Sequence, residues 1–156
     1  MKIIKSIIYL FLFILTTIPL SAFADRGKSN LDFEVISHGG QSGIDHQMSM
    51  VVDSIMHWEH LWMMHTKMQA VPEMLPKVDF DTEIVVAQFL GPVASCGYDI
   101  NTEKVKNKRD YLEVKTIVKL PSGPINCLIA EQPYEIIKFA RTTNRLVKFK
   151  FEFDDD

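Results

Sequence analysis

Two cysteines are the residues whose chemistry depends most on their surroundings. Cys96 stands in the segment GPVASCGYDI, and Cys127 stands in GPINCLIAEQPYEI. A catalytic thiol needs a neighbouring base, and Ser95 and Gly97 beside Cys96 supply none. A metal site needs clustered ligands such as a CxxC pair, whereas these cysteines are isolated. In an oxidising compartment two cysteines usually pair, so we expect a disulfide between Cys96 and Cys127, with two free buried thiols as the alternative.

Histidines and carboxylates are the other candidates for catalysis or metal binding. His57, His60 and His65 occur together in HWEHLWMMH, but on a helix only the first two share a face, and the segment contains no HExxH motif. Four further carboxylates are scattered and pair with no histidine in the sequence: Asp79, Asp81, Asp99 and Glu131. We therefore expect no catalytic residues, no metal site and no cofactor, and a protein that is not an enzyme.

The beginning of the chain determines the expected compartment. Two lysines precede an unbroken apolar run at residues 7–15, and the small-residue site Ala22-Phe23-Ala24 follows, as in a secretory signal peptide. An uncleaved membrane anchor is the alternative, but the run is shorter than the ~20 residues of a spanning helix. We expect residues 1–24 to be a signal peptide and residues 25–156 to be one exported domain with a short acidic C-terminal tail, periplasmic or secreted.

The charge balance excludes some classes of partner. The chain has 17 Lys and Arg against 20 Asp and Glu, a net charge of −3. Loss of Lys2 and Lys5 with the signal peptide moves this to about −5, so the surface is mildly acidic. Such a surface argues against nucleic acid, and against a membrane after cleavage, as partners. The length suits a single domain that buries its own core.

The segment DSIMHWEHLWMMHTKMQA has the pattern of an amphipathic helix. Asp53 or Ser54 can cap it. One face collects mostly apolar residues: Ile55, Trp58, Leu61, Trp62 and His65. We expect Trp58, Trp62 and His65 to be structural anchors of this helix rather than a ligand platform, with His65 partly buried at the helix edge.

The rest of the chain favours strands and turns. Residues 33–52 predict a hairpin with a glycine-rich turn, and the dense apolar run EIVVAQFLG predicts a central strand. Residues 98–105 and 111–120 predict the arms of another hairpin. RLVKFKFEF alternates, with Val147, Phe149, Phe151 and Phe153 on one face. The fold class predicted is α+β: one amphipathic helix packed on a mostly antiparallel twisted β-sheet or small β-sandwich.

Five segments, in this order, resemble the PrcB-type C-terminal domain of exported protease-complex regulatory subunits: HWEHLWMMH, VDFDTEIVVAQFLG, GYDI, LEVKTIVKLPSGPINC and EQPYEIIKF. The resemblance covers residues 37–140. The residues that match the family's pattern are Trp58, Trp62, His65, Gly91, Gly97, Tyr98, Cys127, Pro133 and Tyr134. The chain departs from the family before Gly97, where it has PVASC instead of a Pro-Thr-Gly-Gly type of stretch, so the disulfide is expected from the residues and not from the family.

The resemblance implies a non-enzymatic exported domain that supports or regulates a protein partner such as a protease complex. Its candidate binding loops contain Pro92, Gly97, Tyr98, Gly123, Pro124, Pro133 and Tyr134. A Cys96–Cys127 disulfide would hold two of these loops and reduce the entropic cost of binding. The alternative is a cysteine-protease inhibitor, because the loop from Gly91 to Tyr98 weakly resembles the wedge loop of chagasin-like inhibitors, although the asparagine and threonines of that loop are missing.

Overall fold

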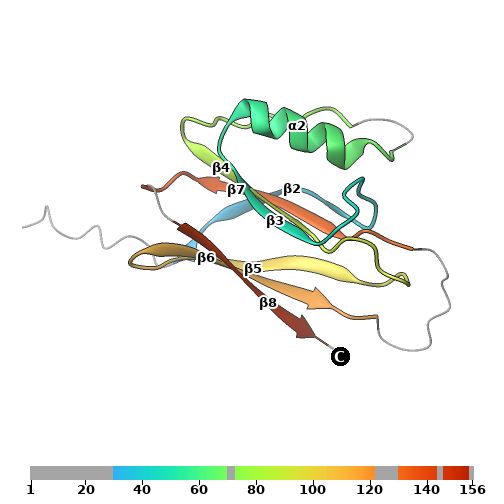
Figure 1. Cartoon of the computed structure of the whole chain (residues 1–156). Helices are drawn as coiled ribbons and strands as arrows, with labels where there is room; N and C mark the ends of the chain where they lie inside the picture. Colours follow the sequence, from blue (N-terminus) through green and yellow to red (C-terminus); the bar gives the residue numbers. More distant parts are fainter. Residues whose placement is uncertain (1–29, 70–72, 122–129, 144–145, 155–156) are drawn as a thin grey trace, which may run out of the picture.

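The protein is described here by a computed structural model, which covers residues 30–69, 73–121, 130–143 and 146–154. These residues form three layers, with helix α2 (Ile55–Thr66) on the outside of two stacked four-stranded sheets (Figure 1). All but one of the strand pairs are antiparallel. The prediction of an α+β fold, with one helix packed on mostly antiparallel strands, is confirmed.

The middle layer is a sheet in the order β2-β7-β4-β3. Its strands are β2 (Phe33–Gly39), β3 (Met48–Val52), β4 (Glu83–Phe89) and β7 (Tyr134–Ala140). Residues 84–89 of β4 are all buried, because the helix covers one face of this sheet and the second sheet covers the other. A strand that is buried on both faces reads as a continuous apolar run, and the prediction of a central strand is confirmed.

The predicted hairpin at residues 33–52 is wrong. β2 and β3 lie at opposite edges of the middle sheet, because β7 and β4 occupy the positions between them. The glycine-rich segment crosses the end of the sheet and reaches the helix instead, where the Gly43 amide donates a hydrogen bond to the carbonyl of His65 at 2.6 Å. This bond satisfies one of the carbonyls that the last turn of a helix leaves without an intrahelical donor.

The outer sheet has the order β1-β5-β6-β8. Its strands are β1 (Asn30–Leu31), β5 (Asp99–Asn107), β6 (Tyr111–Lys119) and β8 (Leu146–Asp154). β5 and β6 form the hairpin that the sequence predicts. β8 pairs with β6 in parallel. Its alternating face packs Val147 and Phe149 against the core, but Phe153 is 62% exposed.

Two apolar cores lie between the three layers. The core between the helix and the middle sheet contains Trp58, Leu61 and Trp62 from the helix, with Val85, Phe89 and other strand residues. The core between the sheets contains residues such as Val86, Val114 and Ile137. Burying each large apolar side chain contributes about 1.5–3 kcal/mol, so the two cores are the main stabilising term.

Helix α2 begins after Ser54, whose extended backbone makes it the N-cap, although no side chain caps the helix by a hydrogen bond. Within the described ranges, no helix is long and apolar enough to cross a membrane. The predicted signal peptide at residues 1–24 lies outside the described residues.

Candidate interaction site

The two tryptophans of α2 are interior residues that also hold the segment after the helix. Trp58 is 0% and Trp62 is 5% exposed, and their ring centroids are 5.2 Å apart. The indole N–H of Trp58 donates to the carbonyl of Pro76, and that of Trp62 donates to the carbonyl of Glu73, both at 3.0 Å. A buried indole usually finds such a partner. Neither ring is available to a ligand.

His65 is completely buried, deeper than the helix-edge position that the sequence predicts. Its Nδ1 lies 3.0 Å from the hydroxyl of Ser42, and that hydroxyl also accepts the amide of Ile44. Burial lowers the pKa of His65 from 6.5 to about 4. The ring is therefore neutral at physiological pH and belongs to the core.

Tyr134 and Pro133, which the sequence analysis assigned to a binding loop, are both buried, and this assignment is corrected. Tyr134 is 4% exposed, with its ring centroid 4.2 Å from that of His65 and its hydroxyl 3.1 Å from the hydroxyl of Ser37. Tyr134 is the first residue of β7, and its side chain points toward the helix layer because strand residues alternate between faces. With 4% of its surface exposed, it packs inside the fold and not on a binding surface.

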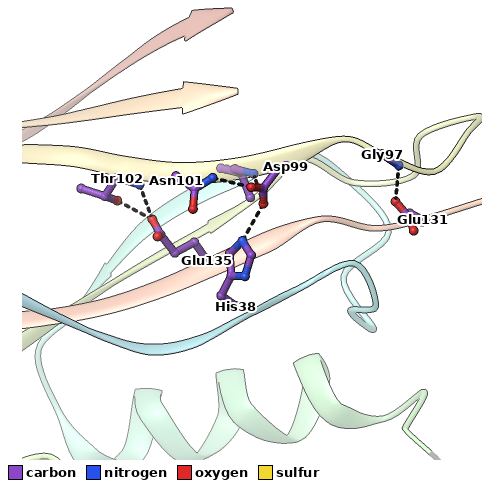
Figure 2. Close-up of polar contacts among 8 residues, drawn as sticks. His38, Gly97, Asp99, Asn101, Thr102, Glu131 and Glu135 are labelled. Atoms are coloured by element: carbon purple, nitrogen blue, oxygen red, sulfur yellow. Dashed lines mark hydrogen bonds and ion pairs between the residues drawn. The ribbon is translucent and has the colours of Figure 1, made fainter. Parts of the chain in front are cut away.

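The loop at residues 91–98 connects the middle sheet to the outer sheet, and Glu131 fixes it twice. The backbone of Val93 pairs with the backbone of Glu131 through hydrogen bonds of 2.8 and 3.3 Å. The amide of Gly97 donates to the carboxylate of Glu131 at 3.2 Å (Figure 2). Gly97 has φ = 95°, a conformation that residues with a side chain rarely adopt. The path of the loop is therefore set by the hydrogen bonds that its backbone makes with Glu131.

Part of this loop remains accessible to solvent. Pro92, Ala94 and Gly97 are exposed, and Tyr98 is half-buried. The other predicted binding residues, Gly123 and Pro124, lie outside the described residues, as does Cys127. No free cysteine occurs within the described part of the chain, and the pairing of Cys96 with Cys127 stays a prediction.

A histidine–carboxylate pair lies next to the loop, where β2 passes the start of β5 (Figure 2). His38 Nε2 is 2.6 Å from a carboxylate oxygen of Asp99, and both side chains are a little over one-third exposed. Burial acts to raise the pKa of Asp99, but hydrogen bonds from Asn101 and His38 outweigh it and leave the pKa below its ordinary value. Asp99 is therefore an anion at neutral pH and holds the imidazole in one orientation.

Behind this pair, a buried polar chain crosses between the sheets. One oxygen of Glu135 on β7 accepts both the amide and the hydroxyl of Thr102 on β5, each at 2.6 Å. Gln88 on β4 donates to the Thr102 hydroxyl at 3.2 Å and accepts the hydroxyl of Thr116 at 2.8 Å. Burial raises the pKa of Glu135, although the hydrogen bonds from Thr102 act in the opposite direction.

Among the described residues, His38 is paired with Asp99, and no nucleophilic side chain is recorded in a hydrogen bond with its imidazole. An imidazole oriented by a carboxylate serves catalysis when it also reaches a nucleophile. Ser37 is adjacent to His38 in the sequence, but its hydroxyl bonds Tyr134 on the opposite face of β2. In the described ranges, no three His, Cys, Asp or Glu side chains are grouped to hold a metal ion. The arrangement orients polar groups and connects the sheets.

Sequence reasoning missed His38, Glu135, Gln88 and the two threonines. A signal for two of them is present, because Gln88 interrupts the apolar run EIVVAQFLG and Glu135 interrupts PYEIIKF. A polar residue inside a strand buried on both faces requires a buried hydrogen-bond partner. The partner itself depends on which strands face each other, and this is not visible in the sequence.

Comparisons of the chain with protein-family models, with curated proteins and with solved structures returned no match. The resemblance to the PrcB-type domain therefore remains a prediction from the segments quoted above.

Proposed function

We propose that the protein is a non-enzymatic exported domain that binds another protein through the loop at residues 91–98. One observation carries the proposal: the backbone of the loop is fixed by Glu131 while Pro92, Ala94 and Gly97 face solvent. A loop that is already ordered loses little conformational freedom on binding, so more of its contact energy appears as affinity.

The surroundings of the loop support this assignment. Buried Tyr134 and the hydrogen bonds between Glu135 and Thr102 anchor the strands next to the loop. Tyr98, which is partly exposed, belongs to a residue type that is enriched at interface hot spots. The partner class that fits the resemblance is an exported protease complex, which the domain would stabilise or regulate.

The test compares three forms of the purified exported protein as bait on an extract of its own compartment. Ala94→Arg places a bulky charge on the loop. Thr143→Arg places the same charge on an exposed residue after β7, at the opposite end of that strand from Glu131, and is the matched control. Each partner that the native protein enriches is then purified and its dissociation constant is measured against all three forms.

We expect the native protein and Thr143→Arg to bind one partner equally and Ala94→Arg to bind it at least tenfold more weakly. Equal binding by all three forms would remove the loop from the interface. Failure of the native protein to enrich any partner above a blank matrix would contradict the binding function. Micromolar inhibition of a papain-like protease by the native protein, lost in Ala94→Arg, would replace this proposal with the inhibitor alternative.

A further inference from the structure

The methionines of this protein are concentrated in one segment and fall into two classes. Seven of the eight lie between residues 48 and 74. Three of them, Met48, Met50 and Met64, pack against the core as ordinary apolar side chains. The other four have side chains that are 63–91% exposed: Met56, Met63, Met68 and Met74. Core packing therefore does not explain the exposed four.

Two exposed methionines share a helix face with an exposed histidine. Met56, His60 and Met63 are separated by four and three residues on α2, so they fall within an arc of about 60° at 3.6 residues per turn. Neighbours at these spacings have Cβ atoms about 5–6 Å apart. Trp58, Leu61 and Trp62 turn the opposite face toward the middle sheet, so this face points to solvent (Figure 1).

The composition of the face favours a metal ion over an apolar partner. An apolar docking surface is a continuous stripe, whereas His60 separates Met56 from Met63 and the charged residues Glu59 and Lys67 flank them. Thioether sulfur is a soft ligand that prefers copper(I), and imidazole also binds copper. Methionine has three rotatable side-chain bonds, so both sulfurs can turn toward the histidine between them.

We propose that Met56, His60 and Met63 bind one copper(I) ion on the solvent face of α2, through two thioether sulfurs and one imidazole nitrogen. The ion is held on a preformed helix, and binding requires movement of side chains only. A harder metal such as zinc lacks a suitable ligand set here, because two of the three donors are thioethers. The proposal is independent of the loop at residues 91–98, which lies at the end of the sandwich and on other elements.

The test measures copper(I) binding by the full exported protein under anaerobic conditions, against a copper(I) chelator of known affinity. Any free thiol is alkylated first and no thiol reductant is used, so that Cys96 and Cys127 cannot supply ligands. Met56→Leu and Met63→Leu each remove one sulfur while keeping side-chain size and helix preference. Met68→Leu is the matched control, because Met68 is equally exposed but lies beyond the end of α2.

We expect one copper(I) per molecule, at least tenfold weaker binding in Met56→Leu and in Met63→Leu, and unchanged binding in Met68→Leu. Silver(I), a redox-inert substitute, should shift the methionine methyl NMR signals of Met56 and Met63 and leave those of Met48 and Met50 in place. Failure to retain one equivalent against the chelator would overturn the proposal. So would an equal loss in Met68→Leu, which would indicate diffuse binding to any exposed methionine.

Discussion

At the scale of single residues, two buried ionisable groups respond to acid in opposite ways. His65 is neutral in the folded protein, because burial lowers its pKa from 6.5 to about 4. Glu135 has a raised pKa for the same physical reason. Burial disfavours the charged form in both cases, and that form is the acid form of histidine and the base form of glutamate.

His65 makes the folded protein less stable in mild acid. Between pH 6.5 and 4 the unfolded chain binds a proton at this residue and the folded protein does not, so stability falls as the pH falls through this window. The contribution reaches up to about 3 kcal/mol. In His65→Phe this part of the pH dependence should disappear, measured as the difference in unfolding free energy between the two proteins. A native imidazole that titrates near 6.5 by NMR would contradict this.

The stability of the protein should depend more on the hydrogen-bond acceptor of Glu135 than on its charge. Glu135→Leu leaves the amide and hydroxyl of Thr102 without their shared acceptor, which should cost about 2–4 kcal/mol in unfolding free energy. Glu135→Gln keeps a carbonyl acceptor and should cost less than half as much. Because the folded pKa is raised, the native protein loses stability as the pH rises above about 4.5, and Glu135→Gln should not. Equal costs for both variants would show that this acceptor does not stabilise the fold.

At the scale of elements, the contact between the segment at residues 40–47 and the end of α2 determines the position of the helix on the sheet. The Gly43 amide donates to the helix carbonyl of His65, so the two backbones approach closely. A Cβ atom at Gly43 would overlap the backbone carbonyl oxygen of Met64. Position 43 needs glycine because a side chain would not fit there, and not because the backbone makes a turn that only glycine allows.

Gly43→Ala should therefore destabilise the protein by about 1–3 kcal/mol, the cost of forcing an extra group into packed structure. Gly40→Ala is the control, because its Cβ would meet only the side chain of Glu131, no closer than 3.3 Å, and a shift of a few tenths of an ångström relieves that approach. Urea unfolding of both variants measures the difference. A Gly43→Ala protein as stable as Gly40→Ala would mean that this contact is not fixed in solution.

The helix and the strands were easier to predict from the sequence than the pairing between strands. Helix α2, the β5–β6 hairpin and the central strand β4 were recognisable, because spacing and apolar runs report which residues are buried. The pairing of β2 with β7 and the parallel pairing of β8 with β6 were not, since both join segments far apart in the chain. Tyr134 was assigned to the wrong environment for this reason: its burial comes from α2 and β2 together.

At the scale of the whole molecule, the connection between the sheets is partly polar. The apolar core between them is accompanied by the chain from Glu135 through Thr102 and Gln88 to Thr116. Hydrogen bonds have direction, so this chain fixes how the sheets are aligned, whereas apolar contacts alone tolerate sliding. The loop at residues 91–98 runs between two strands that this chain joins, β4 through Gln88 and β5 through Thr102.

The predicted Cys96–Cys127 disulfide would act on the whole chain by closing a loop of about 30 residues, worth roughly 3–4 kcal/mol. After free thiols are blocked, the intact mass should be two hydrogens below the reduced mass, with no blocking group added. Reduction should lower the melting temperature by about 10 °C. The Cys96→Ser, Cys127→Ser double variant should melt at the same temperature with and without reductant. Two blocked thiols in the unreduced protein would contradict the prediction.

The parallel strand β8 has a consequence for chains that lose it. β8 is an edge strand and the last element in sequence, and it covers the backbone groups along one side of β6. A molecule cut before residue 146 would expose that side of β6, which is a template for any strand of matching pattern. Such a molecule is expected to accept a separate peptide of residues 146–154, or the β8 of a second copy, and so to assemble by strand exchange.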